Sequence, residues 1–426
     1  TGNSASTILT FIDTGPQADG RGGDVTINAQ TIEMTTSLIS TGTFTAVTQD
    51  IFPIGSAGNL TINANSFLGN FANFSTAGDS SFGSNQHAGD ITLNVHSFHG
   101  TNHSGADLTG DFGGGVTITA DTFIMDASTL QAFTLSGPGK PIIFNGHVLE
   151  LNNGSTWTTS TFGDGTAGDI RVSASDHVSL IGQTEQNVIV SGNPTGIFCN
   201  SQGFFGQGAA GNIVVTTPRL TMDQGKINTT TLSSGSGGNV TINANVVEMS
   251  GEFPPGFAGD FFFFNVGNVQ SSGIFTQTIG SEFCIGPCGN AGNINITTGS
   301  LVMGSGSQIN SGTTNSGQGG NITIQATHTI SMSGTLSDGS PVGIFSRTVG
   351  TDPGSGNGGN IELHASQSQV SNGAQISAST LGPGNAGSVI IEGTASPAQS
   401  ILIDGTGRGI FTDTQGRGAG GNIFLD

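Results

Sequence analysis

Apolar and polar residues alternate along this chain in short segments that return at regular intervals. A small residue or Gly, then Gly, then Asn or Asp precede an apolar–polar–apolar segment, as in GGNVTIN and AGNINIT. Such alternation predicts a β-strand with one buried face. We call the first apolar residue of each segment the anchor. The anchors are Val25, Leu60, Ile91, Val116, Ile142, Ile170, Ile213, Val240, Ile294, Ile322, Ile361, Val389 and Ile423.

Two further apolar columns follow the anchors. All six Met residues lie nine or ten positions after an anchor, at Met34, Met125, Met222, Met249, Met303 and Met332. A third apolar position follows at Ile227, Ile309 and Ile376. We therefore expect three short strands, separated by turns, in each repeat. Three strands per repeat predict an all-β parallel β-helix of about 13 coils, whose stacked coils bury one narrow core. Met fills irregular gaps, so the Met column is interpreted as core rather than as haem or copper ligands.

The residue before the anchor is Asn or Asp in most repeats. Its exchange with Asp24, Asp90 and Asp169 after Gly favours an Asx turn that tolerates left-handed backbone geometry. Stacked amides forming a ladder are a second possibility, and calcium binding is less favoured because calcium prefers carboxylates. The expected turn ladder contains Asn59, Asn212, Asn239, Asn293, Asn321, Asn360 and Asn422.

Short and long repeats alternate from Ile142 onward, with anchor spacings of 28, 43, 27, 54, 28, 39, 28 and 34 residues. The long repeats share a GIF motif, with GTFT at position 42 as a further copy, and the extra length predicts loop insertions in alternate coils. The insertion 251–270 is rich in Phe, including Phe261, Phe262, Phe263 and Phe264. These Phe residues either fold back against the flank of the helix or form a lateral apolar patch for another chain or a hydrophobic substrate.

Charge restricts the partners. The 426-residue chain has 8 Lys and Arg against 28 Asp and Glu, a formal net charge of -20. Such acidity repels nucleic acid, so no nucleic-acid partner is expected. No apolar run is long enough to span a membrane as a helix. Since no export signal follows Thr1, we expect a processed or excised chain.

Side chains that could carry catalysis are scattered. No paired carboxylates with nearby basic residues are evident, so neither catalytic residues nor a cofactor is expected, and a β-helix polysaccharide-degrading enzyme is the less favoured alternative. His87, His96, His99 and His103 do not have zinc-site spacing, and we expect no metal site. Cys284 and Cys288 can close a local disulfide, whereas Cys199 is interpreted as a small half-buried residue. The Ser- and Thr-rich third strands, as in NTTTL, vary too much for an ice-binding array.

GSAGNLTINANSF and GSGGNVTINANVVEMSG resemble the coil repeats of filamentous-haemagglutinin-like exoproteins of two-partner secretion systems. The resemblance covers nearly the whole chain. It implies a right-handed β-helix that is exported, lies outside the cell or on the bacterial surface, and acts in adhesion, aggregation or matrix building. Partners would then be cell-surface or matrix components.

The two ends match in length and phase. Residues 423–426 form a partial coil, and adding residues 1–24 completes a 28-residue coil that places Ile12 where Ile376 falls. We expect the C-terminal half-coil of one molecule to be completed by the next molecule, giving a head-to-tail homopolymer. The alternative is a segment of one longer secreted β-helical adhesin. The expected end contacts are Ile423, Phe424, Leu425, Asp426, Thr1, Ile8, Phe11 and Ile12.

Overall fold

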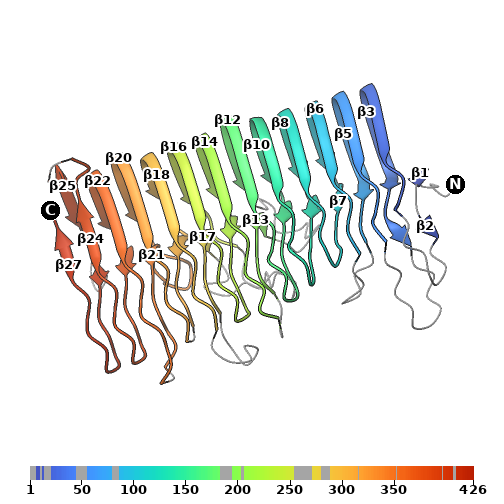
Figure 1. The fold of residues 1–426 in the computed structure, drawn as a ribbon. Helices are drawn as coiled ribbons and strands as arrows, with labels where there is room; N and C mark the ends of the chain where they lie inside the picture. The colour runs from blue at the N-terminus through green and yellow to red at the C-terminus, as the bar shows by residue number, and fades with distance from the viewer. Residues whose placement is uncertain are drawn as a thin grey trace.

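The computed structural model is a parallel β-helix whose coils stack along one axis, with the two ends of the chain at opposite ends of the rod (Figure 1). It describes residues 6–9, 12–13, 21–44, 55–78, 86–182, 194–202, 206–253, 271–279, 288–314, 316–351, 353–395, 397–405 and 409–426. One sheet of 25 strands runs through the coils, and the pairs between successive coils are parallel. The expected all-β parallel solenoid is therefore confirmed.

Each coil starts with a long strand. These strands are β3 (Val25–Ser40), β5 (Leu60–Ser75), β6 (Ile91–Thr101), β8 (Val116–Asp126), β10 (Ile142–Asn152), β12 (Ile170–Ile181), β14 (Ile213–Asp223), β16 (Val240–Ser250), β18 (Ile294–Met303), β20 (Ile322–Ser333) and β22 (Ile361–Ser371). In the next coil the long strand is divided into β24 (Val389–Glu392) and β25 (Ser400–Ile403). The last strand is β27 (Ile423–Leu425).

A short strand follows on the opposite side of the core. This column contains β1 (Ser6–Leu9), β7 (Gly105–Asp107), β9 (Thr129–Gln131), β11 (Thr156–Thr158), β13 (Thr195–Phe198), β15 (Gly225–Asn228), β17 (Ser272–Phe275), β19 (Ser307–Asn310), β21 (Gly343–Phe345), β23 (Gln375–Ser377) and β26 (Ile410–Phe411). A single bridging residue, such as Thr231 or Thr278, then precedes the next coil. Two further strands, β2 (Ile12–Asp13) and β4 (Thr43–Phe44), pair only with each other.

Every anchor pairs with the next anchor along the helix, from Val25 opposite Leu60 to Val389 opposite Ile423. The register predicted from the anchor spacing is thus the register of the fold. Anchors from Leu60 to Val389 are at most 1% exposed. Burial of these branched aliphatic side chains supplies much of the stabilisation, roughly 1.5–3 kcal/mol for each.

The expected three separate strands per coil are wrong in one respect. The anchor segment and the Met segment are continuous in the long strands, which bend without a turn. The bend lies at a row of small residues that includes Gly146, Ala174 and Ala244, and register shifts accompany it between Gly146 and Val148. A strand can bend there because small side chains leave room and an extra residue relieves the pairing.

The extra residues lie in alternate coils, as expected. Three coils carry long connections between the long and short strands, at 182–194, 251–271 and 334–342. The short coil before each of them connects through residues 153–155, 224 and 304–306, respectively. The short connections turn through left-handed residues such as Asn153 and Gln224.

The GIF motif is the short strand itself rather than part of an insertion. Ile274 of β17 pairs with Ile227 on one side and Ile309 on the other. GTFT is not a copy of this motif, because Phe44 pairs with Asp13 in the separate two-stranded sheet and Ile39 occupies the column instead. The sequence GTFT at position 42 therefore resembles the GIF motif but lies in a different register.

Candidate functional site

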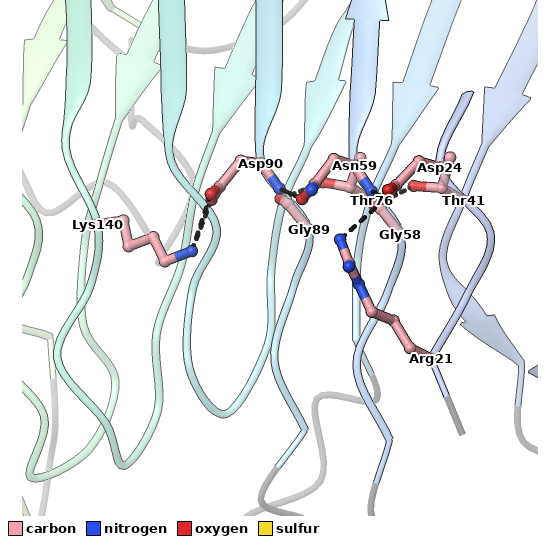
Figure 2. A network of polar contacts seen from close by, with 9 residues as sticks. All are labelled: Arg21, Asp24, Thr41, Gly58, Asn59, Thr76, Gly89, Asp90 and Lys140. Carbon is pink, nitrogen blue, oxygen red and sulfur yellow. Dashed lines mark hydrogen bonds and ion pairs between the residues drawn. The ribbon is translucent and has the colours of Figure 1, made fainter. Parts of the chain in front are cut away.

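The Asn and Asp residues before the anchors form a ladder that runs along the rod. The side-chain Oδ1 atom of each residue accepts a hydrogen bond from the backbone N–H of its counterpart in the next coil. Asn59 donates to Asp24 at 2.7 Å and Asp90 donates to Asn59 at 2.9 Å (Figure 2). After Asp169 the ladder passes through Asn212, Asn239, Asn293, Asn321 and Asn360 to Ser388, whose hydroxyl accepts from Asn422.

This geometry corrects the predicted role of these residues. The described Asn and Asp residues of the ladder do not adopt a left-handed backbone; the left-handed residues lie at other turns. Asn and Asp exchange because both present an oxygen acceptor. Side-chain amide contacts occur as additions, as where Asn239 Nδ2 lies 3.2 Å from Asn212 Oδ1.

The ladder is interrupted between Asp90 and Asp169. Gly115 still donates its N–H to Asp90, but Pro141 occupies the equivalent position in the following coil and has no N–H. Lys140 spans the gap, with Nζ 2.8 and 3.0 Å from the two Asp90 carboxylate oxygens (Figure 2). The ion pair therefore bridges the first part of the interruption, from Asp90 to Lys140.

A second ladder was not predicted. Three residues before the main ladder, Asn290 accepts from Gln318 N–H, Gln318 from Asn357, Asn357 from Asn385, and Asn385 from Ala419. Distances are 2.7–2.9 Å. The recurring amide residue three positions upstream was visible in the sequence, as in GNAGN and GQGGN.

Buried hydroxyl groups join the short strand to the start of the next coil. Thr41 and Thr76 donate to the carbonyls of Gly58 and Gly89 (Figure 2), and Thr229 does so to Gly238 at 2.6 Å. These Thr residues have no exposed surface. The hydroxyls in the Ser- and Thr-rich third strands therefore include internal donors, not only a solvent-facing array.

The six Met residues are buried, Met34 at 8% exposure and the others at no more than 2%. Met222, Met249, Met303 and Met332 are successive partners. Gly69 and Gly100 interrupt the column because the rings of Phe67 and Phe98 occupy the adjacent space. The Met column and the aromatic stack together fill one core.

The two ends of the rod present apolar strand edges. On β27, Ile423, Phe424 and Leu425 are 46%, 51% and 46% exposed. At the opposite end, Ile8 of β1 pairs with Ile39 and is 49% exposed. Ile8, not Ile12, occupies the short-strand column, so the predicted equivalence of Ile12 with Ile376 is wrong. Asp426 donates its N–H to the Ile391 carbonyl. Thr1 and Phe11 lie outside the described residues.

The aromatic side chains of the short strands β13, β17 and β21 are buried. The GIF Phe residues Phe198, Phe275 and Phe345 are at most 3% exposed. Lys226 Nζ lies 4.9 Å from the Phe253 ring centre and 5.5 Å from that of Phe275, and burial lowers the pKa of Lys226 to about 7. The predicted apolar patch, Phe261 to Phe264, lies outside the described residues.

The described Cys and His side chains lie in different environments. Cys288 is disulfide-bonded, and Cys284 lies outside the described residues. Cys199 is a fully buried free thiol rather than half-buried, and burial raises its pKa. His96 pairs with Asp121 at 2.6 Å, and His87 stacks on Phe112 instead of joining the other histidines. Among the described residues no group of three His, Cys, Asp or Glu side chains could hold a metal.

A groove of about 960 Å³ follows the bend of the long strands from β10 to β20. Its lining consists mainly of Ser, Thr, Asn and Ala side chains, with His328 as its one titratable residue. It offers hydroxyl and amide groups for hydrogen bonding.

No protein-family model, curated protein or solved structure matches this chain. In the described part of the chain, no helix is long and apolar enough to cross a membrane.

Proposed function

We propose that this protein is an extracellular structural or adhesive rod, located outside the cell or on a bacterial surface, that forms filaments by head-to-tail stacking. The proposal rests on the register of the anchors, which continues from Val25 to Ile423, and on the last strand, β27, whose apolar side chains are exposed. The unpaired backbone N–H and C=O groups of an edge strand can form hydrogen bonds with a strand of another molecule. A contact that repeats without closing on itself generates a filament.

The end faces are chemically suited to stacking. Ile423 and Leu425 continue the buried columns of Val389 and Ile391, so another coil would bury them in the same way. At the other end, Val25, Ile27 and Ile32 are half-buried and pack against the core. The first ladder residue, Asp24, lies at the same end. Apolar burial and axial hydrogen bonds would therefore act together at a junction.

The alternative is that the same coils belong to one longer secreted β-helical adhesin, so that the neighbouring coil is covalently continuous. A β-helix polysaccharide-degrading enzyme is a less favoured alternative, with the groove along β10 to β20 as the place where a glycan would lie. In the favoured proposal, the partners are other copies of the chain and components of a cell surface or matrix.

Electron microscopy of the purified 426-residue chain tests the proposal. Thirteen coils at a spacing of about 4.8 Å predict a subunit about 60 Å long, and we expect filaments many times that length. Leu425→Asp should abolish them, because a carboxylate would be buried at each junction. Leu381→Asp is the matched control, since Leu381 is 39% exposed but lies on the side of the rod.

Single rods of about 60 Å from the wild-type chain would exclude self-assembly. Mass spectrometry of the native chain would then decide whether the coils continue covalently. Release of shorter sugars from a panel of glycans would instead favour the enzyme.

A further inference from the structure

A small cavity lies on the outer face of the short-strand column, where three successive coils meet. Its volume is about 280 Å³, near the lower end, about 300 Å³, of pockets that hold small ligands. Ser340 and Pro341, from the described insertion 334–342, form one wall. This hairpin is held in place by Ser337, whose N–H and hydroxyl bind the Glu252 carboxylate two coils away at 2.8 and 2.7 Å.

Arg347 is the one charged side chain in the lining of this cavity. Its guanidinium carbon lies 4.5 Å from the centre of the Phe345 ring. Stacking on an aromatic face leaves the N–H edge of a guanidinium available for two parallel hydrogen bonds. The Phe345 ring therefore holds Arg347 in an orientation suited to a planar anion.

Arg347 differs from the described arginines that form ion pairs with Asp or Glu. Arg171 and Arg219 each lie 2.7 Å from a carboxylate oxygen. Within the described ranges no carboxylate lies within 4.0 Å of the Arg347 guanidinium. Burial lowers the pKa of Arg347, which reflects the cost of holding this charge away from water. An anion entering the cavity would offset that cost.

The amide side chains of the cavity supply complementary groups. Gln308 Nε2 donates to the Pro341 carbonyl at 3.0 Å, and Asn310 Oδ1 accepts from Gly312 N–H at 3.0 Å, which leaves the Asn310 Nδ2 group to donate to a ligand. Gln277 is 5% exposed, and its amide oxygen has no hydrogen-bond partner among the residues that the structure describes. That oxygen needs a donor, such as a hydroxyl group.

We propose that this cavity binds a small hydroxy-carboxylate, the chemical class that includes acidic sugars. The carboxylate pairs with the Arg347 guanidinium and accepts from Asn310, and a ligand hydroxyl donates to the Gln277 oxygen after a small rotation of that amide. The cavity lies on the side of the rod, so this inference does not depend on head-to-tail assembly.

Calorimetric titration with glucuronate tests the inference, with glucose and inorganic sulfate as matched probes. Wild-type protein should bind glucuronate, bind sulfate more weakly, and not bind glucose. Arg347→Gln should weaken glucuronate binding at least about tenfold through loss of the charge-assisted pair. Arg219→Gln is the control, because the Arg219 side chain is exposed, paired with Glu248 and outside the cavity.

Equal glucuronate affinity of Arg347→Gln and wild type, or no binding by wild type at millimolar ligand, would overturn the proposal. Circular dichroism checks the fold of each variant. Gln277→Leu provides a second, uncharged test: it should weaken glucuronate binding and leave sulfate binding unchanged. Undiminished glucuronate binding by Gln277→Leu, or sulfate bound as tightly as glucuronate, would exclude the hydroxy-carboxylate.

Discussion

At the residue scale, the polar side chains of this rod act along its axis. Asp24, Asn59 and Asp90 each use one side-chain oxygen to accept a backbone N–H from the next coil. Each such bond contributes modestly, about 0.5–1.5 kcal/mol. Because the contribution requires only an oxygen at the right place, the position tolerates Asn, Asp and, at 388, Ser.

Lys226 gives a pH-dependent prediction. Its pKa is about 7 in the folded protein, against roughly 10.4 in an unfolded chain. Between these values the unfolded chain holds the additional proton, so stability should rise with pH, by at most about 1.4 kcal/mol per pH unit. Lys226→Met should flatten this rise and stabilise the protein below pH 7 relative to wild type.

Chemical denaturation from pH 6 to 10 measures the effect. Lys140→Met is the control, because Lys140 is about half-exposed and paired with Asp90. An identical pH profile for wild type and Lys226→Met would contradict the assigned burial cost.

The location of a residue could be predicted from the sequence where its neighbours are the equivalent residues of the adjacent coils. The anchors and the Met residues follow a fixed spacing, so their columns could be predicted. The left-handed turns at Asn153 and Gln224 could not be predicted, because the same residues are compatible with several turn types. The environment of Arg347 was also hidden, since its cavity combines residues from three coils and an insertion hairpin.

At the element scale, the short strand is fixed from both sides. In β15 the inward Ile227 packs in the core, and the hydroxyl of the following residue, Thr229, binds the carbonyl of Gly238 shortly before the next anchor. Gly238 returns its N–H to the Thr229 carbonyl at 3.2 Å. The same reciprocal pair joins successive coils at Thr41 and Gly58, at Thr76 and Gly89, and at Thr276 and Gly292.

Thr229→Val should therefore destabilise the protein by about 1–3 kcal/mol, because it leaves the Gly238 carbonyl without this donor in a buried place. Thr229→Ser retains the hydroxyl and should lose less. Thermal unfolding compares the two, and hydrogen exchange should show faster opening between β15 and β16 in the Val variant. Equal stability of the Val and Ser variants would mean that the hydroxyl does not stabilise this junction.

At the scale of the whole molecule, the coils from Ile142 onward repeat as pairs, one short and one long. The short strands β13, β17 and β21 each have a Gly, at 196, 273 and 343, where a Cβ would overlap a carbonyl of the following short coil. The described insertion 334–342 also spans the intervening short coil, because Ser337 binds Glu252 two coils away.

Deletion of whole coils tests this unit. Removing 294–360 deletes one short and one long coil and keeps the alternation, so the shortened chain should fold and unfold cooperatively. Removing 294–321 brings two long coils together and should cost on the order of 4 kcal/mol or more through overlapping insertions. Circular dichroism and thermal unfolding distinguish these outcomes; equal stability of the two deletions would show that single coils are the units.

The gap in the ladder at Pro141 has a mechanical consequence. The hydrogen bonds between coils lie along the rod, so a pulling force applied to its ends passes through every coil in series, and the weakest junction sets the force at which the rod yields. At the junction between the coils of Val116 and Ile142 the ladder contributes no hydrogen bond, so the axial load rests on the strand pairs, on the Lys140–Asp90 ion pair and on a few side-chain bonds such as Asn153 to Asp126. Because salt screens an exposed ion pair, this section should be where a stretched rod first unwinds, and at lower force in concentrated salt.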